Sequence, residues 1–397
     1  MASMEAIIDE QPQNVQESLC QIFSQSVIPF FLGGCGSISA GLLLTFANKN
    51  LMLLEEVPEF LVLMPPLQGL RGNLDMTFAA RMSTLAHVGE FDKPGLAIKI
   101  RRNAAVAQGL SIFVCLVANI ISMFIVSVTP SLPEVNNTNR TFTTVSPPPE
   151  KSRNFMFLTS SSIISMAVNC AVCTLLLFTI VYCTWKRHFN PDNIVAPLGA
   201  SISDLLTIGS MLLACYSIRP YSEFNEMVPI VVIVIALFSV PIWLCLAWED
   251  DTAVKIARQQ CLTLIIASMI SCGAGFLQSR GAVQFPNYPA YQTLISGLTG
   301  NRGAVLASRI SSHLEVHKES EMEWNDRARP HRYYMSRSPE AKTAKLLLFT
   351  AVPFQLFFVG VSTLISCLMS DPVETDYRFF LVYPIVVFIQ VWFVSEI

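Results

Sequence analysis

The sequence predicts an all-α polytopic membrane protein. We expect two parallel five-helix repeats joined by a linker helix, with the second repeat lacking its last helix. Hydrophobic residues make up 52% of the 397 residues and charged residues only 14%, whereas about a quarter of a soluble domain is charged. Apolar stretches long enough to cross a bilayer recur along the whole chain. One of them reappears 228 positions later with matching residues.

Ten stretches meet or approach the requirement of about 20 apolar residues for a membrane-spanning helix. The second and the eighth are polar in their second halves, so a strict hydropathy window would omit them. The predicted spans cover residues 22–47, 57–88, 102–129, 155–184, 194–216, 226–248, 259–279, 286–314, 343–369 and 376–395.

The charges of the loops predict the orientation of these spans. With the N-terminus inside, the inner loops hold most of the loop lysines and arginines, above all the loop 315–342. Residues 1–21 are polar and acidic and lack the features of a signal peptide, so we expect a cytosolic tail. The opposite loop, 130–154, contains glycosylation sequons at Asn136 and Asn139, which agrees with an outer position.

The repeat is visible in two segments, GLRGNLDMTFAAR (69–81) and GLTGNRGAVLASR (297–309). Span 226–248 lies between the two units, so the copies run parallel and are related by an axis along the membrane normal. A pore or site should then lie between the halves. The matching pairs are Gly69 and Gly297, Leu70 and Leu298, Gly72 and Gly300, Asn73 and Asn301, Ala79 and Ala307, Arg81 and Arg309, and Ser83 and Ser311.

The repeat predicts the domain boundaries. The tail (1–21) precedes a first repeat (22–216), a linker helix with its loops (217–258) and a second repeat (259–397). The counterpart of the span 194–216 would begin near position 422, after the last residue, Ile397. We therefore expect the second repeat to be truncated.

Asp204 is the candidate functional carboxylate. It lies in the middle of an apolar span without Lys or Arg within ten residues on either side, and an ionisable residue at that depth is costly and indicates function. On the same helix, Pro197 cannot donate a backbone hydrogen bond, and Gly199 loosens the helix further. Ser201 lies one turn from Asp204 and offers a hydroxyl. The alternative is a structural carboxylate bonded to a neighbouring helix.

The repeated motif offers further oxygen ligands. Its prolines and its glycines, Gly69, Gly72, Gly297 and Gly300, are expected to break the helices and expose backbone carbonyls, while Asn73 and Asn301 supply amide oxygens. Such oxygens and one or two acids suit a largely hydrated Mg²⁺ ion. The alternative explanation of the glycines is close helix packing.

Asp75 leaves two interpretations open. It follows Arg71 by one turn and could form a local ion pair with it, or it could be a pore carboxylate. In the second copy Thr299 and Gly303 replace both charges.

Several classes of protein are not supported. The net charge of −3 gives no reason to expect nucleic acid. Cys170 and Cys173 fall inside an apolar span without a nearby histidine, which favours buried thiols over a zinc or redox site. We find no phosphate-binding loop, dinucleotide motif or zinc-protease motif. We expect neither an enzyme nor a permanently bound cofactor.

Three segments resemble the MgtE-type magnesium transporters, and more closely their animal relatives, solute carrier family 41. They are LMPPLQGLRGNLDMTFAARMSTLAHVG (63–89), NPDNIVAPLGASISDLLT (190–207) and ISGLTGNRGAVLASRIS (295–311). The resemblance implies an MgtE-like fold that forms a pseudo-dimeric Mg²⁺ transporter in the lipid bilayer, with Asp204 as the principal ion ligand. The bacterial relatives form a channel between two identical subunits, and some animal members couple Mg²⁺ efflux to Na⁺.

The expected lack of a fifth helix in the second repeat departs from the family pattern and leaves alternatives. The chain could be a non-transporting form that assembles with a full-length transporter and modulates it, or a homo-oligomer. A carrier for an organic solute is disfavoured, because the motifs lack aromatic residues to bind an organic body. The sequons favour the plasma membrane, and the mitochondrial inner membrane is the alternative assignment.

Overall fold

The structure is a computed structural model that describes residues 19–57, 59–128, 148–225, 227–248, 251–285, 287–317, 339–369 and 377–396. Every element within these ranges is a helix. They are α2 (Leu19–Asn50), α3 (Met52–Glu56), α4 (Glu59–His87), η1 (Glu90–Asp92), α5 (Leu96–Val128), α6 (Pro148–Lys186), α7 (Pro191–Phe224), α8 (Met227–Ala247), α9 (Asp251–Gln284), α10 (Tyr288–His317), α13 (Pro339–Met369) and α14 (Tyr377–Glu396).

The helices have the lengths and composition of membrane spans. Seven of them are long and apolar enough to cross a bilayer, namely those in α2, α5, α6, α7, α8, α9 and α13. In a bilayer each backbone polar group must be bonded within the protein, which helices achieve within one segment. The predicted all-α polytopic membrane fold is confirmed. The count of ten spans stays a prediction, since α4 and α10 are too polar for this criterion and α14 is shorter.

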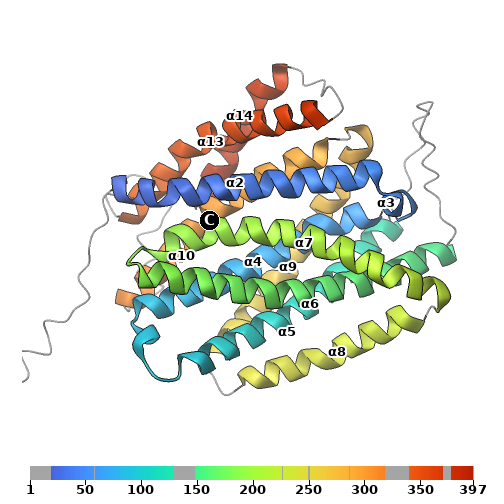
Figure 1. Cartoon of the computed structure of the whole chain (residues 1–397), viewed down its shortest axis with the longest axis horizontal. Helices are drawn as coiled ribbons and strands as arrows, with labels where there is room; N and C mark the ends of the chain where they lie inside the picture. The colour runs from blue at the N-terminus through green and yellow to red at the C-terminus, as the bar shows by residue number, and fades with distance from the viewer. Residues whose placement is uncertain are drawn as a thin grey trace, which may run out of the picture.

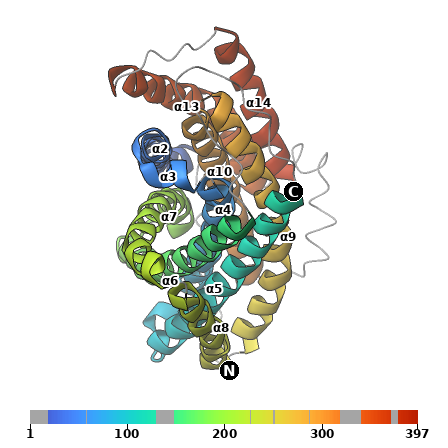
Figure 2. The same ribbon diagram turned by 90° about the vertical axis from the view of Figure 1, so that its right-hand side faces the viewer.

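The long helices run side by side as one bundle (Figure 1). Seen from one end, α4 and α10 lie in the middle of it, with α2 and α7 on one side and α9 on the other (Figure 2). Helix α8 lies at one edge, and α13 and α14 lie at the opposite edge. The two copies of the repeated motif, in α4 and α10, therefore occupy the centre of the molecule.

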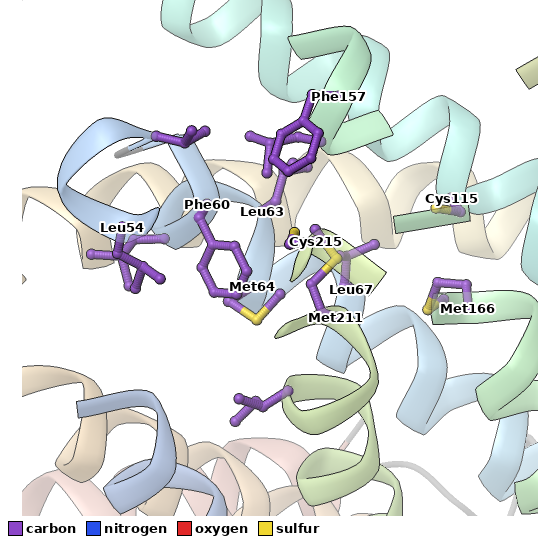
Figure 3. Close-up of a cluster of buried hydrophobic side chains, with 14 of the residues drawn as sticks. Leu54, Phe60, Leu63, Met64, Leu67, Cys115, Phe157, Met166, Met211 and Cys215 are labelled. Atoms are coloured by element: carbon purple, nitrogen blue, oxygen red, sulfur yellow. The ribbon is translucent and has the colours of Figure 1, made fainter. Parts of the chain in front are cut away.

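The largest hydrophobic cluster joins α4 to α5, α6 and α7 (Figure 3). The side chains of Phe60 and Met64 are completely buried in it, next to Met211 of α7. Lipid tails are as apolar as these side chains, so close van der Waals packing stabilises the cluster more than removal from water does. This packing holds α4 and α7 side by side.

In contrast to α4 and α7, helix α8 exposes many of its apolar side chains. Ile235, Phe238 and Ile242 are 63%, 72% and 63% exposed, and their spacing of three and four residues places them on one face. At the predicted inner end of this helix Trp248 is 72% exposed, as is common for aromatic residues at a membrane interface. We interpret this face of α8 as a lipid-facing surface.

The helices around the centre make reciprocal contacts. A Cβ atom on Gly41 of α2 would lie 2.9 Å from the backbone of Ala290 in α10. Likewise, a Cβ atom on Gly275 of α9 would lie 2.2 Å from the carbonyl oxygen of Val62 in α4. Ala290 follows Val62 by 228 positions, which is the offset of the repeated motif. Helix α2 thus packs on α10 as α9 packs on α4, as the predicted repeat requires.

A second pair of contacts has the same form. A Cβ atom on Gly297 of α10 would lie 2.7 Å from the Ser37 hydroxyl of α2, and one on Gly69 of α4 would lie 3.3 Å from the Ser271 hydroxyl of α9. Ser271 and Gly275 follow Ser37 and Gly41 by 234 positions. The first helices of the two predicted units, α2 and α9, are therefore offset by 234 positions, and the second helices, α4 and α10, are offset by 228. These contacts support the domain division, which stays a prediction.

Candidate functional site

Asp204 lies on α7 where this helix faces α10. Its Oδ2 atom is 3.4 Å from the position that a Cβ atom on Gly297 would occupy, so the carboxylate sits against a part of α10 that has no side chain. Asp204 is partly buried. Within the described ranges it has neither a hydrogen-bond donor nor a cationic side chain as partner, so these residues give no support to the alternative of a structural carboxylate bonded to a neighbouring helix.

Asn301 and Ser201 meet one turn nearer the start of α7. The Asn301 side-chain nitrogen donates to the Ser201 hydroxyl at 3.4 Å. Asn301 is completely buried, and its side-chain oxygen has no partner among the described residues. Helix α2 closes this place from the other side, because a Cβ atom on Gly36 would lie 2.7 Å from the Ser201 Cβ.

The Ser37 hydroxyl of α2 completes the cluster. It is buried without a hydrogen-bond partner in the described part of the chain and lies beside Gly297. Asp204, Asn301 and Ser37 therefore converge from α7, α10 and α2, each with an oxygen that no described protein group uses. Unused oxygens from one acid, one amide and one hydroxyl are suitable ligands for a hard cation such as Mg²⁺. We call Asp204, Ser201, Asn301 and Ser37 the seam site.

Comparison with known proteins identifies the chain's relatives. Residues 64–214 match the model of MgtE, described as a divalent cation transporter. Mouse solute carrier family 41 member 3 is 29% identical over 96% of this chain and 75% of its own length. Human solute carrier family 41 member 2 is 27% identical over 89% of this chain and 60% of its own length. No solved structure matches the chain.

Residues 64–214 are thus similar to MgtE, and most of the chain is similar to members of solute carrier family 41. Residues 64–214, here called the MgtE domain, include most of α4 and α7 and all of α5 and α6. The family resemblance predicted from three motifs is thus confirmed. The relatives are transporters rather than enzymes, as the sequence predicted.

Asn73 of the MgtE domain does not share the surroundings of Asn301. It is exposed on α4, and its side chain has no hydrogen-bond partner among the described residues, while its backbone carbonyl accepts from the Thr77 hydroxyl at 2.9 Å. Asn301 is completely buried and contacts Ser201 of α7, whereas the exposed Asn73 has no such contact with α7 or another described helix. The structure brings Asp204, Ser201 and Asn301 together and leaves Asn73 apart, so its role as a metal ligand stays a prediction.

Asp75 forms an ion pair with Arg71. The Arg71 Nε atom donates to Asp75 Oδ2 at 2.9 Å, and both side chains are buried, at 1% exposure or less. This arrangement matches the local ion pair that was one of the two interpretations. The carboxylate is compensated here, unlike that of Asp204, so Asp75 is the weaker candidate for a cation ligand.

The expectation of broken helices was wrong. Helix α4 is continuous from Glu59 to His87 through Pro65, Pro66, Gly69 and Gly72, and α7 and α10 are continuous as well. One proline in a membrane helix removes one donor, and neighbouring helices can satisfy the freed carbonyl. In α4 the carbonyl that Pro66 cannot reach is that of Val62, and it is the atom against which Gly275 packs.

The predicted pore-shaping residues divide into two groups. Gly297 and Gly69 allow serines to approach the helix, and Gly199 faces α6, where a Cβ atom would lie 2.5 Å from Leu177. Gly72 and Gly300 have open space beside them, with nothing within 4 Å of an added Cβ atom. Pro197 falls inside continuous α7. Close packing thus explains Gly199 but not Gly72 or Gly300.

The sequence predictions missed three residues. Ser37 could have been found by aligning α2 with α9 at an offset of 234, where Ser271 is its counterpart. Asp192 follows Asn190 and Pro191 at the start of a helix, a common place for a capping acid, so it did not stand out. Arg302 replaces Leu74 of the first copy, and a single unmatched charge gave no pattern.

Arg302 is 2% exposed and has no carboxylate partner in the described ranges. Its guanidinium donates to the carbonyl oxygens of Leu298 at 3.0 Å and Thr350 at 3.3 Å. Its Cζ atom lies 5.2 Å from the Phe30 ring centroid and 5.9 Å from that of Phe354. Cation–π contacts of this kind stabilise a desolvated guanidinium. Arg302 therefore fixes α10 to α2 and α13, next to the seam site.

The two predicted glycosylation sites lie in a part of the chain that the structure does not describe. The sequons Asn136 and Asn139 lie in residues 129–147, outside the described ranges. Cys170 and Cys173 are described, and both are buried.

Proposed function

We propose that the chain transports Mg²⁺ across a membrane through the seam site. The observation that carries this proposal is the unpartnered carboxylate of Asp204 in an MgtE domain, facing the backbone of α10 beside two further unused oxygens. One carboxylate with neutral oxygens binds a partly hydrated divalent ion without holding it too tightly for release.

The test is Mg²⁺ flux into liposomes that contain only this chain and a Mg²⁺-sensitive dye. Asp204→Asn keeps the shape and removes the charge, so we expect flux to fall by about tenfold or more, because the partly hydrated ion loses the one carboxylate of the seam site. Asp92→Asn, at the exposed end of η1, is the matched control and should keep its flux. Equal flux in both variants would remove Asp204 from the site.

The absence of flux from folded wild-type protein would refute autonomous transport. It would favour the other candidate, a non-transporting form that assembles with and modulates a complete transporter. Co-reconstitution with such a relative would then show a change in the relative's flux. Light scattering on the purified chain would show whether it assembles with itself.

Na⁺ coupling is a finer proposal, suggested by the family resemblance. If Mg²⁺ efflux is coupled to Na⁺ entry, an inward Na⁺ gradient should accelerate efflux, and replacement of Na⁺ by choline should abolish the acceleration. Equal rates in the two media would show passive movement.

We further propose the plasma membrane as the location. The sequons at Asn136 and Asn139, in a predicted outer loop, are used only on the secretory route. Surface biotinylation of the glycosylated chain in intact cells would support this location. Co-purification of an unglycosylated chain with mitochondria would refute it.

A further inference from the structure

Asp192 forms a polar cluster that the seam site does not include. Its Oδ1 atom accepts hydrogen bonds from the Ser83 hydroxyl at 2.5 Å and the Ser308 hydroxyl at 2.6 Å. Its Oδ2 atom lies 3.3 Å from His87 Nε2. The carboxylate is 3% exposed, although it belongs to the first turn of a helix. One buried carboxylate thus ties three helices together: α7, α4 with Ser83 and His87, and α10 with Ser308.

The cluster lies in line with the seam site along the contact between α7 and α10. These helices are antiparallel: Asp204 faces Gly297, Ser201 meets Asn301, and further along the same contact comes Asp192. Asp192 precedes Asp204 by twelve positions, about 18 Å along a helix. It lies at the end where α4 and α10 lead into the loops predicted to be cytosolic.

We propose that Asp192, held by Ser83 and Ser308, is the latch that closes the cytosolic end of the cation pathway between α4, α7 and α10. This inference rests on the proposed function, because a latch needs a pathway. Helices α4 and α10 carry the two copies of the repeated motif, and both bind the same carboxylate oxygen. As long as both hydroxyls donate to it, the two helices and α7 cannot separate at this end.

The chemistry of the latch suits a contact that is tight and still breakable. Hydroxyl hydrogen bonds to a carboxylate are short and stronger than neutral ones. Burial by itself would raise the pKa of Asp192, but hydrogen bonds from His87, Ser308 and Ser83 outweigh burial and hold this pKa below its usual value. The carboxylate therefore stays charged at neutral pH. A cation arriving from the seam site would compete with the hydroxyls for it.

Alanine variants test whether the contact closes the pathway. Ser83→Ala and Ser308→Ala each remove one donor, so we expect Mg²⁺ flux in liposomes to rise by about threefold or more, because each charge-assisted hydrogen bond is lost from the closed state. Adding Asp204→Asn should abolish the increase. Lower flux in the two serine variants, with an unchanged melting temperature, would overturn the latch.

A metal bridge tests the geometry in the opposite direction. The double variant Ser83→Cys/Ser308→Cys places two thiols around the carboxylate and beside the imidazole, a four-ligand set suitable for Cd²⁺. Micromolar Cd²⁺ should raise the melting temperature of the double variant and reduce its Mg²⁺ flux by about tenfold, since soft thiolate ligands hold Cd²⁺ tightly. EDTA should restore the flux.

The controls separate the possible failures. Wild type and each single cysteine variant report the effect of Cd²⁺ on the native cysteines, and they should keep most of their flux. Cd²⁺ that stabilises the double variant while flux continues would show that the cluster lies off the pathway. Cd²⁺ without a stabilising effect specific to the double variant would refute the geometry. Both results leave the proposed transport intact, whereas the absence of flux from wild type would overturn transport and latch together.

Discussion

Two carboxylates at membrane depth differ in how their charge is compensated. Asp75 lies against the guanidinium of Arg71 one turn away, and both side chains are buried. Asp204 has no such partner among the described residues and faces the backbone of α10 at Gly297. A buried charge without compensation is costly and is retained where it has a function. This difference supports the proposal that Asp204, rather than Asp75, is the carboxylate available to a cation.

The Arg71–Asp75 pair should show strong coupling in a double-mutant cycle. Asp75→Leu and Arg71→Leu should each lower the free energy of unfolding by about 3–5 kcal/mol, because each leaves a buried charge unpaired. The double variant should lose much less. Unfolding in a denaturing detergent series measures all four proteins, and losses that simply add would contradict a compensated pair.

The two repeated asparagines should differ in their effect on transport. Asn301→Ala removes a buried side chain that contacts Ser201, so we expect Mg²⁺ flux to fall by about tenfold, consistent with the loss of an ion ligand and an unsatisfied polar partner. Asn73→Ala, on an exposed position, should change flux less than about twofold. Equal losses would indicate that both amides reach the ion.

The sequence could predict which residue types matter but not which of them meet. Asn73 and Asn301 are equivalent by position in the repeat, and only the helices packed around them make one exposed and the other buried. Whether Arg71 and Asp75 form an ion pair was equally undetermined by the sequence, because a spacing of four residues permits an ion pair without requiring it. Side-chain direction and neighbouring helices decide both cases.

Among the helices, close approach through glycine recurs at two equivalent contacts between the predicted repeats, α2 on α10 and α9 on α4. Gly41 packs on Ala290, and Gly275 packs on the carbonyl of Val62. Small residues let membrane helices approach closely, and in α4 the proline turn leaves a carbonyl against which α9 can pack. The sequence predicted the helices well from apolar length. It misjudged their continuity, because a proline or glycine reduces helical stability without saying whether a neighbour compensates.

Gly275 and Gly273 offer a matched comparison on one helix. A Cβ atom on Gly275 would clash with a backbone oxygen, whereas one on Gly273 would meet nothing within 4 Å. Gly275→Ala should therefore destabilise the protein by about 1–3 kcal/mol through overpacking. Gly273→Ala should be neutral or stabilising by up to about 1 kcal/mol, because alanine favours a helix.

Detergent-induced unfolding followed by circular dichroism compares the two variants. The control is wild type at the same protein and lipid concentration. If both substitutions have the same effect, the close contact between α9 and α4 does not determine stability. If Gly275→Ala alone lowers stability, the reciprocal partner Gly41→Ala should do so as well.

At the scale of the whole molecule, the loop charges and the bundle together predict a defined orientation. The predicted inner loops hold most of the loop lysines and arginines, and α8 exposes an apolar face where a lipid boundary is expected. Composition alone sufficed for this level of the fold, since a chain with so few charges has few other stable environments. The order of the helices around the centre required the repeat and the contacts.

Glycan mapping tests this orientation. We expect the chain from animal cells to shift in mobility after treatment with an endoglycosidase, and the shift to disappear in Asn136→Gln/Asn139→Gln. A sequon introduced into the turn at residues 88–95, on the predicted inner side, should stay unmodified. Modification of the introduced sequon, with none at the native ones, would reverse the assigned orientation.

Helix α7 connects the two ends of the proposed pathway as a single rigid rod. It is continuous from Pro191 to Phe224, so a displacement along its axis moves Asp204 and Asp192 together, by about 1.5 Å for each residue of slip. Hydrogen bonds of 2.5 and 2.6 Å at Asp192 leave no slack for such a slip. An ion that shifts Asp204 along the axis of α7 must therefore also displace Asp192 from Ser83 and Ser308, unless α7 bends at Pro197. The stiffness of one helix thus sets how strongly ion binding and closure act on each other.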